Sequence, residues 1–348
     1  MTARDEQLAD FVLERPPLAG PVEGRSTLAE LGDLTMTRKP RSLWSDAWRR
    51  FRRNKIALIG LAYLIFLVFV AVFAPVIATQ NPVRADVAKA GTLRQAAWIE
   101  DPNPLKTGDW AYPLGTDSIG RDVFSRLVYG TRVSLIVGFI PMLVILLIGV
   151  PFGLTAGYAG GRIDNLMMRI TDVVYAFPAL LLAIVMQISF GSTRFGSLLN
   201  GLVLLFLSLS IVNWTGVARL VRGQVLSLKE KEFVEAARSI GAPTWRILLN
   251  HLMPNVISPI IIAAAFAVPG YIITEAILGY LGLGVRPAVN LDAPFPTSWG
   301  SMINEGNSAI SNQPAMLAAP AFAVALVFMA FTFLGDGLRD ALDPRMKQ

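Results

Sequence analysis

Six apolar runs of membrane-spanning length constrain most strongly what this chain can fold into. Each is close to the ~20 helical residues that cross a bilayer core of about 30 Å. The first, second and fourth runs contain no Asp, Glu, Lys or Arg. Their apolar residues are continuous and do not alternate, which predicts transmembrane α-helices and disfavours a β-barrel. The runs are 56–78, 133–157, 170–190, 198–218, 256–280 and 316–335.

Composition supports a membrane protein and excludes several kinds of site. Hydrophobic residues make up 53% of the chain and charged residues 16%, against about 25% charged residues in an ordinary soluble domain. There is no cysteine and a single histidine, His251, which excludes disulfides, thiolate chemistry and histidine-rich metal sites. The chain has no Gly-Lys dipeptide, so it lacks a Walker-type ATP site. We therefore expect a non-enzyme without catalytic, cofactor or metal sites.

Lys and Arg residues near the ends of the runs predict the orientation of the chain. Residues 38–55, just before the first run, carry eight of them and the connection 219–255 carries six, whereas 191–197 and 281–315 carry one each. This places both termini, the short loop 158–169 and the connection 219–255 in the cytoplasm. The loop 79–132 is then external although it is basic, since long loops cross membranes with little regard to charge.

These features divide the chain into four parts. Residues 43–55 (LWSDAWRRFRRNK) place aromatic side chains at helical spacing among basic ones, which favours a helix lying in the membrane interface over a transmembrane helix with a basic end. The parts are a mobile cytoplasmic tail at 1–40, the interfacial helix with the first span and the long external loop at 41–132, a five-helix core at 133–340, and a cytoplasmic tail at 341–348.

Small residues and prolines predict how the spans pack. Gly149, Gly153 and Gly157 repeat at four-residue spacing on one face of the second span, which allows close approach of another helix. Prolines are expected to bend or loosen the second and third spans. They are Pro141, Pro151 and Pro178.

Ionisable residues inside the spans are few. Asp172, Glu275 and Asp336 each lie near the end of a run, which favours helix-end positions over a proton relay. Glu275 is the best candidate for such a relay if the chain is an ion-coupled carrier.

The connection 219–255 is more elaborate than a link between two spans requires. Gly241 stands where a helix C-terminal cap is expected, Pro243 can open a second helix, and Pro254 is expected to end it before the fifth span. The segment therefore predicts a helix, a sharp turn and a second helix. Its apolar faces are Phe233, Ala236, Ala237 and Ile240 in the first helix and Trp245, Leu248, Leu249 and Leu252 in the second.

Such a compact apolar element has two interpretations. It suits docking into a groove of another protein, or it packs on its own bundle. The residues alone leave both open.

Two motifs in this connection resemble motifs of a known family. Glu235-Ala236-Ala237, followed by Gly241 and Pro254, resembles the EAA loop of ABC importer permeases. His251 and Met253 depart from the general pattern, and HLMPN (251–255) resembles the variant found in the peptide and nickel permease branch.

Further segments resemble the C-type permease subunit of that branch. Its signature before the second span is matched by Gly115, Thr116, Asp117, Gly120, Arg121 and Asp122. Other matching segments are 42–55, 275–284, 299–303 and 335–345, so that the resemblance covers 42–345. Two departures are Tyr112, at a place often held by histidine, and the longer stretch 285–298.

The resemblance implies an all-α type I ABC importer permease fold with six transmembrane helices in the cell membrane. It implies a heterodimer with a homologous B-type permease, two cytoplasmic ABC ATPase subunits that hydrolyse ATP, and an extracytoplasmic substrate-binding protein, without nucleic acid. Glu235, Ala236, Ala237 and Gly241 would form the coupling helix in an ATPase cleft. Members of the branch carry dipeptides, oligopeptides, nickel chelates, glutathione or oligosaccharides.

Two other functional classes compete with an importer subunit. One is an ion-coupled carrier or channel without an ATPase, and the other is a membrane scaffold that binds the ATPase without transport. The EAA-type loop argues against the first class, and the glycine- and proline-rich spans argue against the second.

Several single residues carry structural expectations. His251 is expected to cap the second short helix, with contact to the ATPase as the alternative. Asp117, Arg121 and Asp122 are expected to form an internal clamp that orders the external loop, with contact to the binding protein as the alternative. Trp299 is expected to anchor the chain at the membrane interface.

Overall fold

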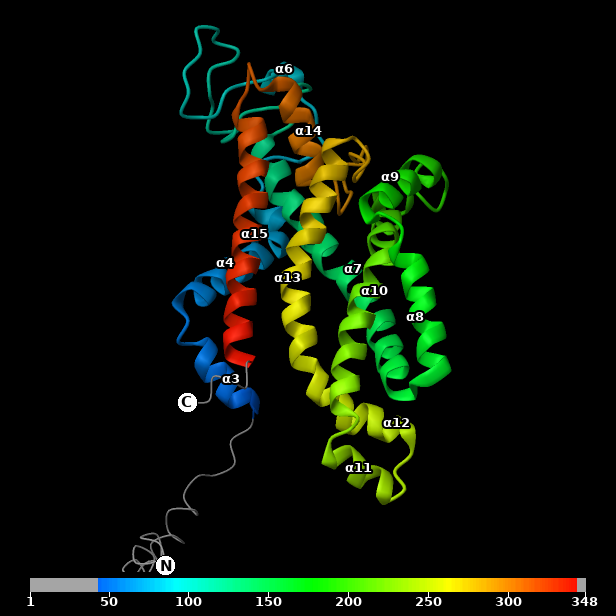
Figure 1. Cartoon of the computed structure of the whole chain (residues 1–348). Helices are drawn as coiled ribbons and strands as arrows, with labels where there is room; N and C mark the ends of the chain where they lie inside the picture. The colour runs from blue at the N-terminus through cyan, green and yellow to red at the C-terminus, as the bar shows by residue number, and fades with distance from the viewer. Residues whose placement is uncertain (1–42, 343–348) are drawn as a thin grey trace, which may run out of the picture. The chain divides into compact units, whose positions relative to one another are not determined.

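The computed structural model describes residues 43–342 (Figure 1). The chain divides into the units Met1–Asp46 and Ala47–Gln348, and all candidate spans belong to the second unit. The tails predicted at 1–40 and 341–348 lie outside the described residues, apart from the last two residues of α15.

Residues 43–342 contain no strand, only two isolated bridges. The helices are α3 (Leu43–Phe51), α4 (Lys55–Val72), α5 (Ala74–Ile77), α6 (Val87–Ala90), α7 (Val123–Ala159), α8 (Gly161–Tyr175), α9 (Ala179–Phe190), η1 (Leu198–Gly201), α10 (Leu202–Leu228), α11 (Glu232–Ser239), α12 (Thr244–Arg246), η2 (Ile247–Leu252), α13 (Met253–Tyr280), α14 (Trp299–Ala309) and α15 (Ala315–Leu342).

The six predicted spans correspond to five long apolar helices and one bent pair. The five lie at Lys55–Val72, Val123–Ala159, Leu198–Leu228, Thr244–Tyr280 and Ala315–Leu342. The region of the third predicted span forms α8 and α9, which meet at an angle of 67° and together are long and apolar enough for one bent span. Pro178 is the N-cap of α9, directly after this break, because its ring and missing N–H prevent α8 from continuing.

Within Ala47–Gln348, α7 and α10 form the most extensively packed helix pair. A side chain at Gly153 would place its Cβ 2.4 Å from the carbonyl oxygen of Ala218, and a Cβ at Gly149 would lie 2.7 Å from that of Trp214. At Gly157 the Cβ would meet Val225 at 2.8 Å. The close approach predicted for the three glycines is thus confirmed, with α10 as the partner helix.

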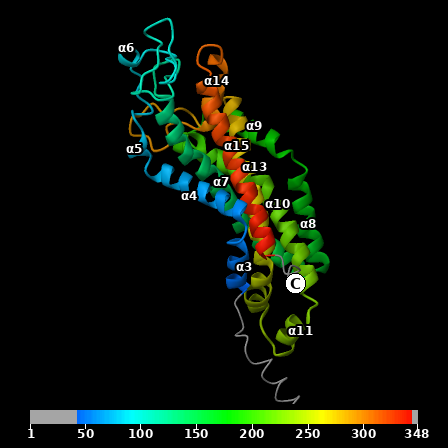
Figure 2. The same cartoon turned by 90° about the vertical axis from the view of Figure 1, so that its left-hand side faces the viewer.

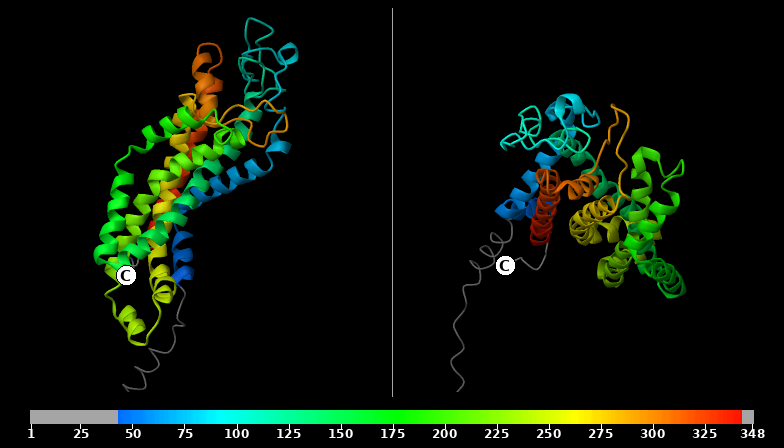
Figure 3. Two further views of the ribbon diagram at one scale, coloured as in Figure 1. Left: turned by 90° about the vertical axis from the view of Figure 1, so that its right-hand side faces the viewer. Right: turned by 90° about the horizontal axis from the view of Figure 1, so that it is seen from above.

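The other spans are arranged around this pair. Seen along the bundle, α13 lies between α10 on one side and α15 on the other (Figure 3). The oblique α4 packs on α15 (Figure 2), where Gly60 lies against the backbone of Ala330.

Several helix boundaries differ from the prediction. α7 begins at Val123, ten residues before the apolar run, because polar side chains in its first turns are buried against protein. α8 occupies most of the predicted loop 158–169, and α10 continues past residue 218 to Leu228. These polar extensions are held by ion pairs, Arg219 with Asp172 at 2.7 Å and Arg222 with Asp164 at 2.5 Å. The connection 281–315, which is predicted to be external, contains α14, which the sequence did not predict.

The two elaborated connections lie at opposite ends of the bundle. α11 and α12 lie at one end, whereas α6, α14 and the loop between α4 and α7 lie at the other (Figure 1). One apolar core of buried residues fills the bundle between these ends, and a second core lies under α11 and α12.

Candidate functional site

The connection between α10 and α13 forms the predicted helix–turn–helix, here called the knob (residues 229–252). Four apolar side chains hold it to the ends of α7 and α10 in the second core: Val234, Ala237, Ile247 and Leu252 are all buried. Arg238 adds a polar contact, since its Nε donates to the hydroxyl of Tyr158 at 3.3 Å. The knob is therefore fixed on its own bundle by its inner face.

The turn of the knob is a Schellman motif around Gly241. The N–H of Gly241 donates to the carbonyl of Arg238 at 2.9 Å, and that of Ala242 donates to Ala237 at 3.0 Å. Gly241 has φ of +75°, in the left-handed region that side chains disfavour. The cap predicted at Gly241 is thus confirmed. Pro243 is the N-cap of α12 and not its first residue.

The outer face of the knob exposes large apolar side chains. Ile240 is 85% exposed, Trp245 58%, Leu249 56% and Phe233 40%. Of the apolar face predicted for the first helix, only Ala237 is buried, and Ala236 is exposed. Val234 is buried although it was not predicted to pack inward, and Glu235 is exposed. Because two faces of the first helix are apolar, periodicity could not tell which one packs inward. The knob both packs on its bundle and presents an unpartnered apolar surface within the described chain.

The prediction that Pro254 ends the second helix is wrong. α12, η2 and α13 form one helix, Thr244–Tyr280, with Pro254 near the start of α13. A π-helical turn at Ile247–Leu252 precedes the proline and gives the wider turn that accommodates a residue without an N–H. His251 lies inside this turn and therefore caps no helix end.

At the opposite end, the predicted clamp is a buried ion-pair network. Asp117 is fully buried and accepts from Arg121 Nε at 2.6 Å and Arg126 Nη1 at 2.7 Å. Both arginines also bind Glu305 of α14, at 2.9 Å and 2.5 Å, and Arg126 donates to Thr297 at 3.1 Å. The network thus joins the long loop before α7, the start of α7 and α14.

Asp122 has a different role from the one expected. It caps α7 by accepting from the N–H groups of Phe124 and Ser125, and it accepts from the Thr79 hydroxyl at 2.7 Å. Thr116 joins two parts of the loop before α7. Its hydroxyl accepts from the N–H of Arg94 at 3.0 Å and donates to the carbonyl of Gly91 at 3.1 Å.

The two motif glycines have backbone roles. Gly115 and Gly120 have φ of +77° and +81°. A Cβ at Gly115 would lie 2.1 Å from the carbonyl oxygen of Arg94. Tyr112, the departure from histidine, is buried beside them, and burial together with the carboxylate of Asp86 raises its pKa above the usual value.

Two residues at this end of the bundle were not predicted from the sequence. Glu305 carries no motif signal, and only its position in an otherwise uncharged segment distinguishes it. Gln313 donates to the carbonyls of Arg94 at 3.0 Å and Leu114 at 2.8 Å. The interface role expected of Trp299 is wrong, since it is buried against Gly130 and donates to the carbonyl of Leu127 at 2.9 Å.

Glu275 lies where α13 packs on the start of α14. It is fully buried, and within the described residues neither carboxyl oxygen has a hydrogen-bond partner. A Cβ at Gly279, one turn later, would lie 2.6 Å from the carbonyl carbon of Gly300. No group of three His, Cys, Asp or Glu residues between 43 and 342 could hold a metal ion.

The extra stretch 285–298 packs on neighbouring loops. The N–H of Arg286 donates to the carbonyl of Asn200 at 2.9 Å, and the Asn200 side chain donates to Phe295 at 3.1 Å. Asn81 donates to the carbonyl of Leu291 at 3.1 Å. The stretch therefore links the loop before α10 to the loop after α4.

Comparison with known proteins assigns the family. Residues 149–348 match the family described as binding-protein-dependent transport system inner membrane component. Residues 42–96 match the N-terminal transmembrane domain of oligopeptide transport permease C.

Relatives match almost the whole chain. The dipeptide transport system permease protein DppC of Bacillus subtilis (strain 168) is 41% identical over 88% of this chain and 87% of its own. The oligopeptide permease OppC of the same organism is 39% identical over 92% of this chain and 96% of its own. The glutathione permease GsiD of Pectobacterium atrosepticum is 38% identical over 88% of this chain and 93% of its own. A solved inward-facing structure of the MetNI methionine ABC transporter covers 63% of this chain and 97% of its own at 20% identity, with a TM-score of 0.49.

The family matches and the near-full-length relatives agree with the six-span bundle and with the resemblance carried by residues 42–345. The chain belongs to the inner membrane components of binding-protein-dependent ABC transport systems, in the branch of the C-type peptide permeases.

Proposed function

We propose that the chain forms half of the translocation pathway of an ATP-driven importer. It pairs with a homologous B-type permease, two ABC ATPase subunits dock on the cytoplasmic face, and an extracytoplasmic binding protein delivers the solute. ATP is hydrolysed in the ATPase subunits and not in this chain. The relatives transport dipeptides, oligopeptides and glutathione, which supports peptides or a related small solute as cargo.

The observation that carries this proposal is the outer face of the knob. Ile240 and Trp245 project beside the turn at Gly241 while the inner face stays packed, so a partner can bind without unfolding the knob. Glu235 is exposed on the same short helix and offers a charge to a basic group of the ATPase. Apolar anchors with a charged neighbour are typical of a helix that docks in a groove.

Continuity of the helix below the knob supports a mechanical role. Thr244–Tyr280 is a single helix of 37 residues, about 55 Å long at 1.5 Å per residue. Its far end packs on α14, where Glu305 joins the clamp with Arg126. Movement of the knob on ATP binding would be transmitted along this helix to the external face, which favours switching between two global states.

The same arrangement supports an orientation. With the knob in the cytoplasm, the clamp and the stretch 285–298 face the outside, and both termini lie on the cytoplasmic side of the cell membrane. The carboxyl end of α15 lies toward the knob end of the bundle (Figure 1), as this orientation requires.

Gentle purification of the tagged chain from its native membrane tests the proposal. Mass spectrometry should find a homologous permease and one or two ATPases with Walker motifs. Recovery of the chain alone, under conditions that keep other membrane complexes intact, would contradict it and favour an ion-coupled carrier.

Charge reversal at Glu235 should uncouple the transporter. In the Glu235→Lys variant we expect normal membrane insertion, because the side chain is exposed, but at least tenfold lower uptake and loss of substrate-stimulated ATPase activity. Uptake and ATP hydrolysis are measured in proteoliposomes with the binding protein. Glu230→Lys makes the same charge change before α11 and serves as the control. Equal activity of the two variants would contradict docking through Glu235.

Gly241 should be replaceable by asparagine but not by valine. No atom lies within 4 Å of a Cβ built there, so the penalty comes from the φ of +75° alone. That penalty is about 1–2 kcal/mol for most side chains and smaller for asparagine. We expect Gly241→Val to reduce ATPase binding in a pull-down assay, and Gly241→Asn to retain most of it. Similar loss in both variants would indicate that the partner contacts the glycine itself.

A further inference from the structure

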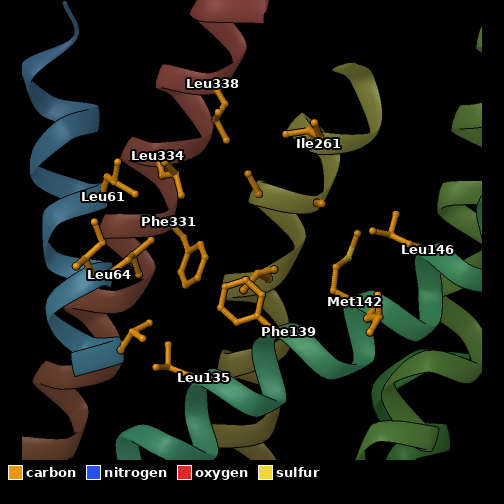
Figure 4. A pocket seen from close by; sticks show the side chains of 16 residues that line it. Leu61, Leu64, Leu135, Phe139, Met142, Leu146, Ile261, Phe331, Leu334 and Leu338 are labelled. Carbon is orange, nitrogen blue, oxygen red and sulfur yellow. The ribbon is translucent and has the colours of Figure 1, made fainter. Parts of the chain in front are cut away.

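An apolar groove runs between α4 and α15 on one side and α7 and α13 on the other. Its volume is about 540 Å³, and every lining side chain is apolar. Leu61, Leu334 and Phe331 face Phe139 and Met142 across it (Figure 4). No residue in this part of the described chain fills the groove.

One end of the groove lies next to a basic turn. Leu61, Leu334 and Leu338 line the groove and also pack against the small core formed by Phe51, Ala57 and Ala341. Phe51 is followed directly by the turn between α3 and α4, where Arg52, Arg53 and Lys55 are all exposed.

The fold of this turn is fixed. Asn54 caps α4 by accepting from the N–H of Ala57 at 3.1 Å, and Gly337 lies close against Ala57. The backbone that carries the three cationic side chains is therefore fixed near the end of the groove that Leu61 and Leu338 line.

The dimensions of the groove fit a lipid chain. Its lining runs along α4 from Leu61 to Val68, and Val68 lies about 20 Å from Lys55 at 1.5 Å per residue. One leaflet of the bilayer core is about 15 Å thick. A headgroup at Lys55 would thus place its acyl chain along the apolar lining.

The charges beside the groove favour a lipid over a helix of a partner subunit. An anionic headgroup supplies a counter-charge to the three exposed cations, whereas a wholly apolar helix would not.

We propose that the groove binds one phospholipid with an anionic headgroup. The acyl chain lies between α4, α7 and α13, and the phosphate binds Arg52, Arg53 and Lys55 on the cytoplasmic side. Basic clusters beside transmembrane helices attract anionic lipids, and burial of each CH₂ group adds to the binding. This bound lipid would tie the interfacial turn to the bundle. The proposal goes beyond the proposed transport function and needs only that the chain spans a membrane.

Native mass spectrometry of the purified protein with its co-purified subunits tests this site. After delipidation in mild detergent, the sample is titrated with dioleoyl phosphatidylglycerol or dioleoyl phosphatidylcholine. We expect one phosphatidylglycerol to bind in preference to phosphatidylcholine. Arg52→Gln/Arg53→Gln should reduce its affinity roughly 30-fold, since each basic residue contributes about fivefold. Arg162→Gln/Arg169→Gln removes two exposed arginines from α8 and should leave the affinity unchanged.

A second pair of variants tests the groove itself. Ala264→Trp places an indole on a residue that lines it, so we expect loss of the bound lipid. Ala263→Trp changes the neighbouring residue of α13, which does not line the groove, and should retain it.

Three results would overturn the proposal. One is equal binding of the two lipids. Another is equal affinity in the two arginine double variants. The third is release of the partner permease by Ala264→Trp while the lipid stays bound, which would assign the groove to the subunit interface. Lipid binding is measured without transport, so its failure is distinct from failure of the transport function.

Discussion

Replacing Arg126 by glutamine should prevent stable folding of the end of the bundle that contains α14 and the long loop before α7. Arg126 is almost fully buried and binds both Asp117 and Glu305. Without it, Arg121 alone must neutralise two carboxylates, of which Asp117 is fully buried and Glu305 is 22% exposed. Removal of one partner from a buried ion pair costs about 3–5 kcal/mol, because an uncompensated charge stays behind. We expect a thermal unfolding temperature at least 10 °C lower for the purified complex in detergent, or no recoverable complex.

The double variant Arg126→Gln/Glu305→Gln is the control for this prediction. It leaves Asp117 paired with Arg121 at 2.6 Å and restores neutrality in the network. We therefore expect it to be clearly more stable than Arg126→Gln alone, although it has two changes. If the effects of Arg126→Gln and Glu305→Gln simply add, the residues do not act as a charge-balanced unit.

Substitution of Gly153 by leucine should separate α7 from α10. The added side chain would meet the backbone carbonyl of Ala218 and the side chain of Val221 at 2.4 Å and 2.7 Å from its Cβ. A backbone atom cannot move aside as a flexible side chain can, so the cost should be about 3 kcal/mol or more. We expect loss of the folded complex, measured by size-exclusion chromatography in mild detergent after expression at a level matched to the wild type.

Gly223 of α10 provides the matched control. It lies on the exposed side of α10 with no atom within 4 Å of a Cβ built there. Gly223→Leu should therefore give a stable chain that inserts normally. If Gly153→Leu elutes as the wild type does, α7 and α10 can repack, and the glycine row is not needed for the bundle.

The spans were predictable because a helix surrounded by lipid must consist almost entirely of apolar residues. Uncharged runs of about 20 residues have few alternative structures. Apolar composition did not predict helical segments that are surrounded by protein and not by lipid. The first ten residues of α7 include Arg126 and were read as loop, because hydropathy cannot recognise a charge that is neutralised by Asp117 and Glu305. α14 was missed since its polar residues resemble those of a loop.

The sequence predicted the turn of the candidate site but not which face of its first helix is buried. Gly241 was identified because a left-handed position strongly favours glycine. Whether Phe233 and Ile240 pack inward or face a partner was left open, because an apolar residue on a helix carries no mark of whether its own chain or another covers it. Likewise, local rules predict that a helix ends at Pro254. The π-helical turn before Pro254 explains how the helix continues instead.

The division of the knob into two faces has a consequence for how partner choice can change. The side chains that secure its fold, such as Val234 and Ile247, are distinct from those that face outward, such as Ile240 and Trp245. Substitutions outside therefore carry little penalty for the permease itself. Duplicated transport systems in one cell could diverge at these outer positions and keep their subunits from mixing, since specificity is a difference between affinities. Recognition can thus evolve here without passing through misfolded intermediates.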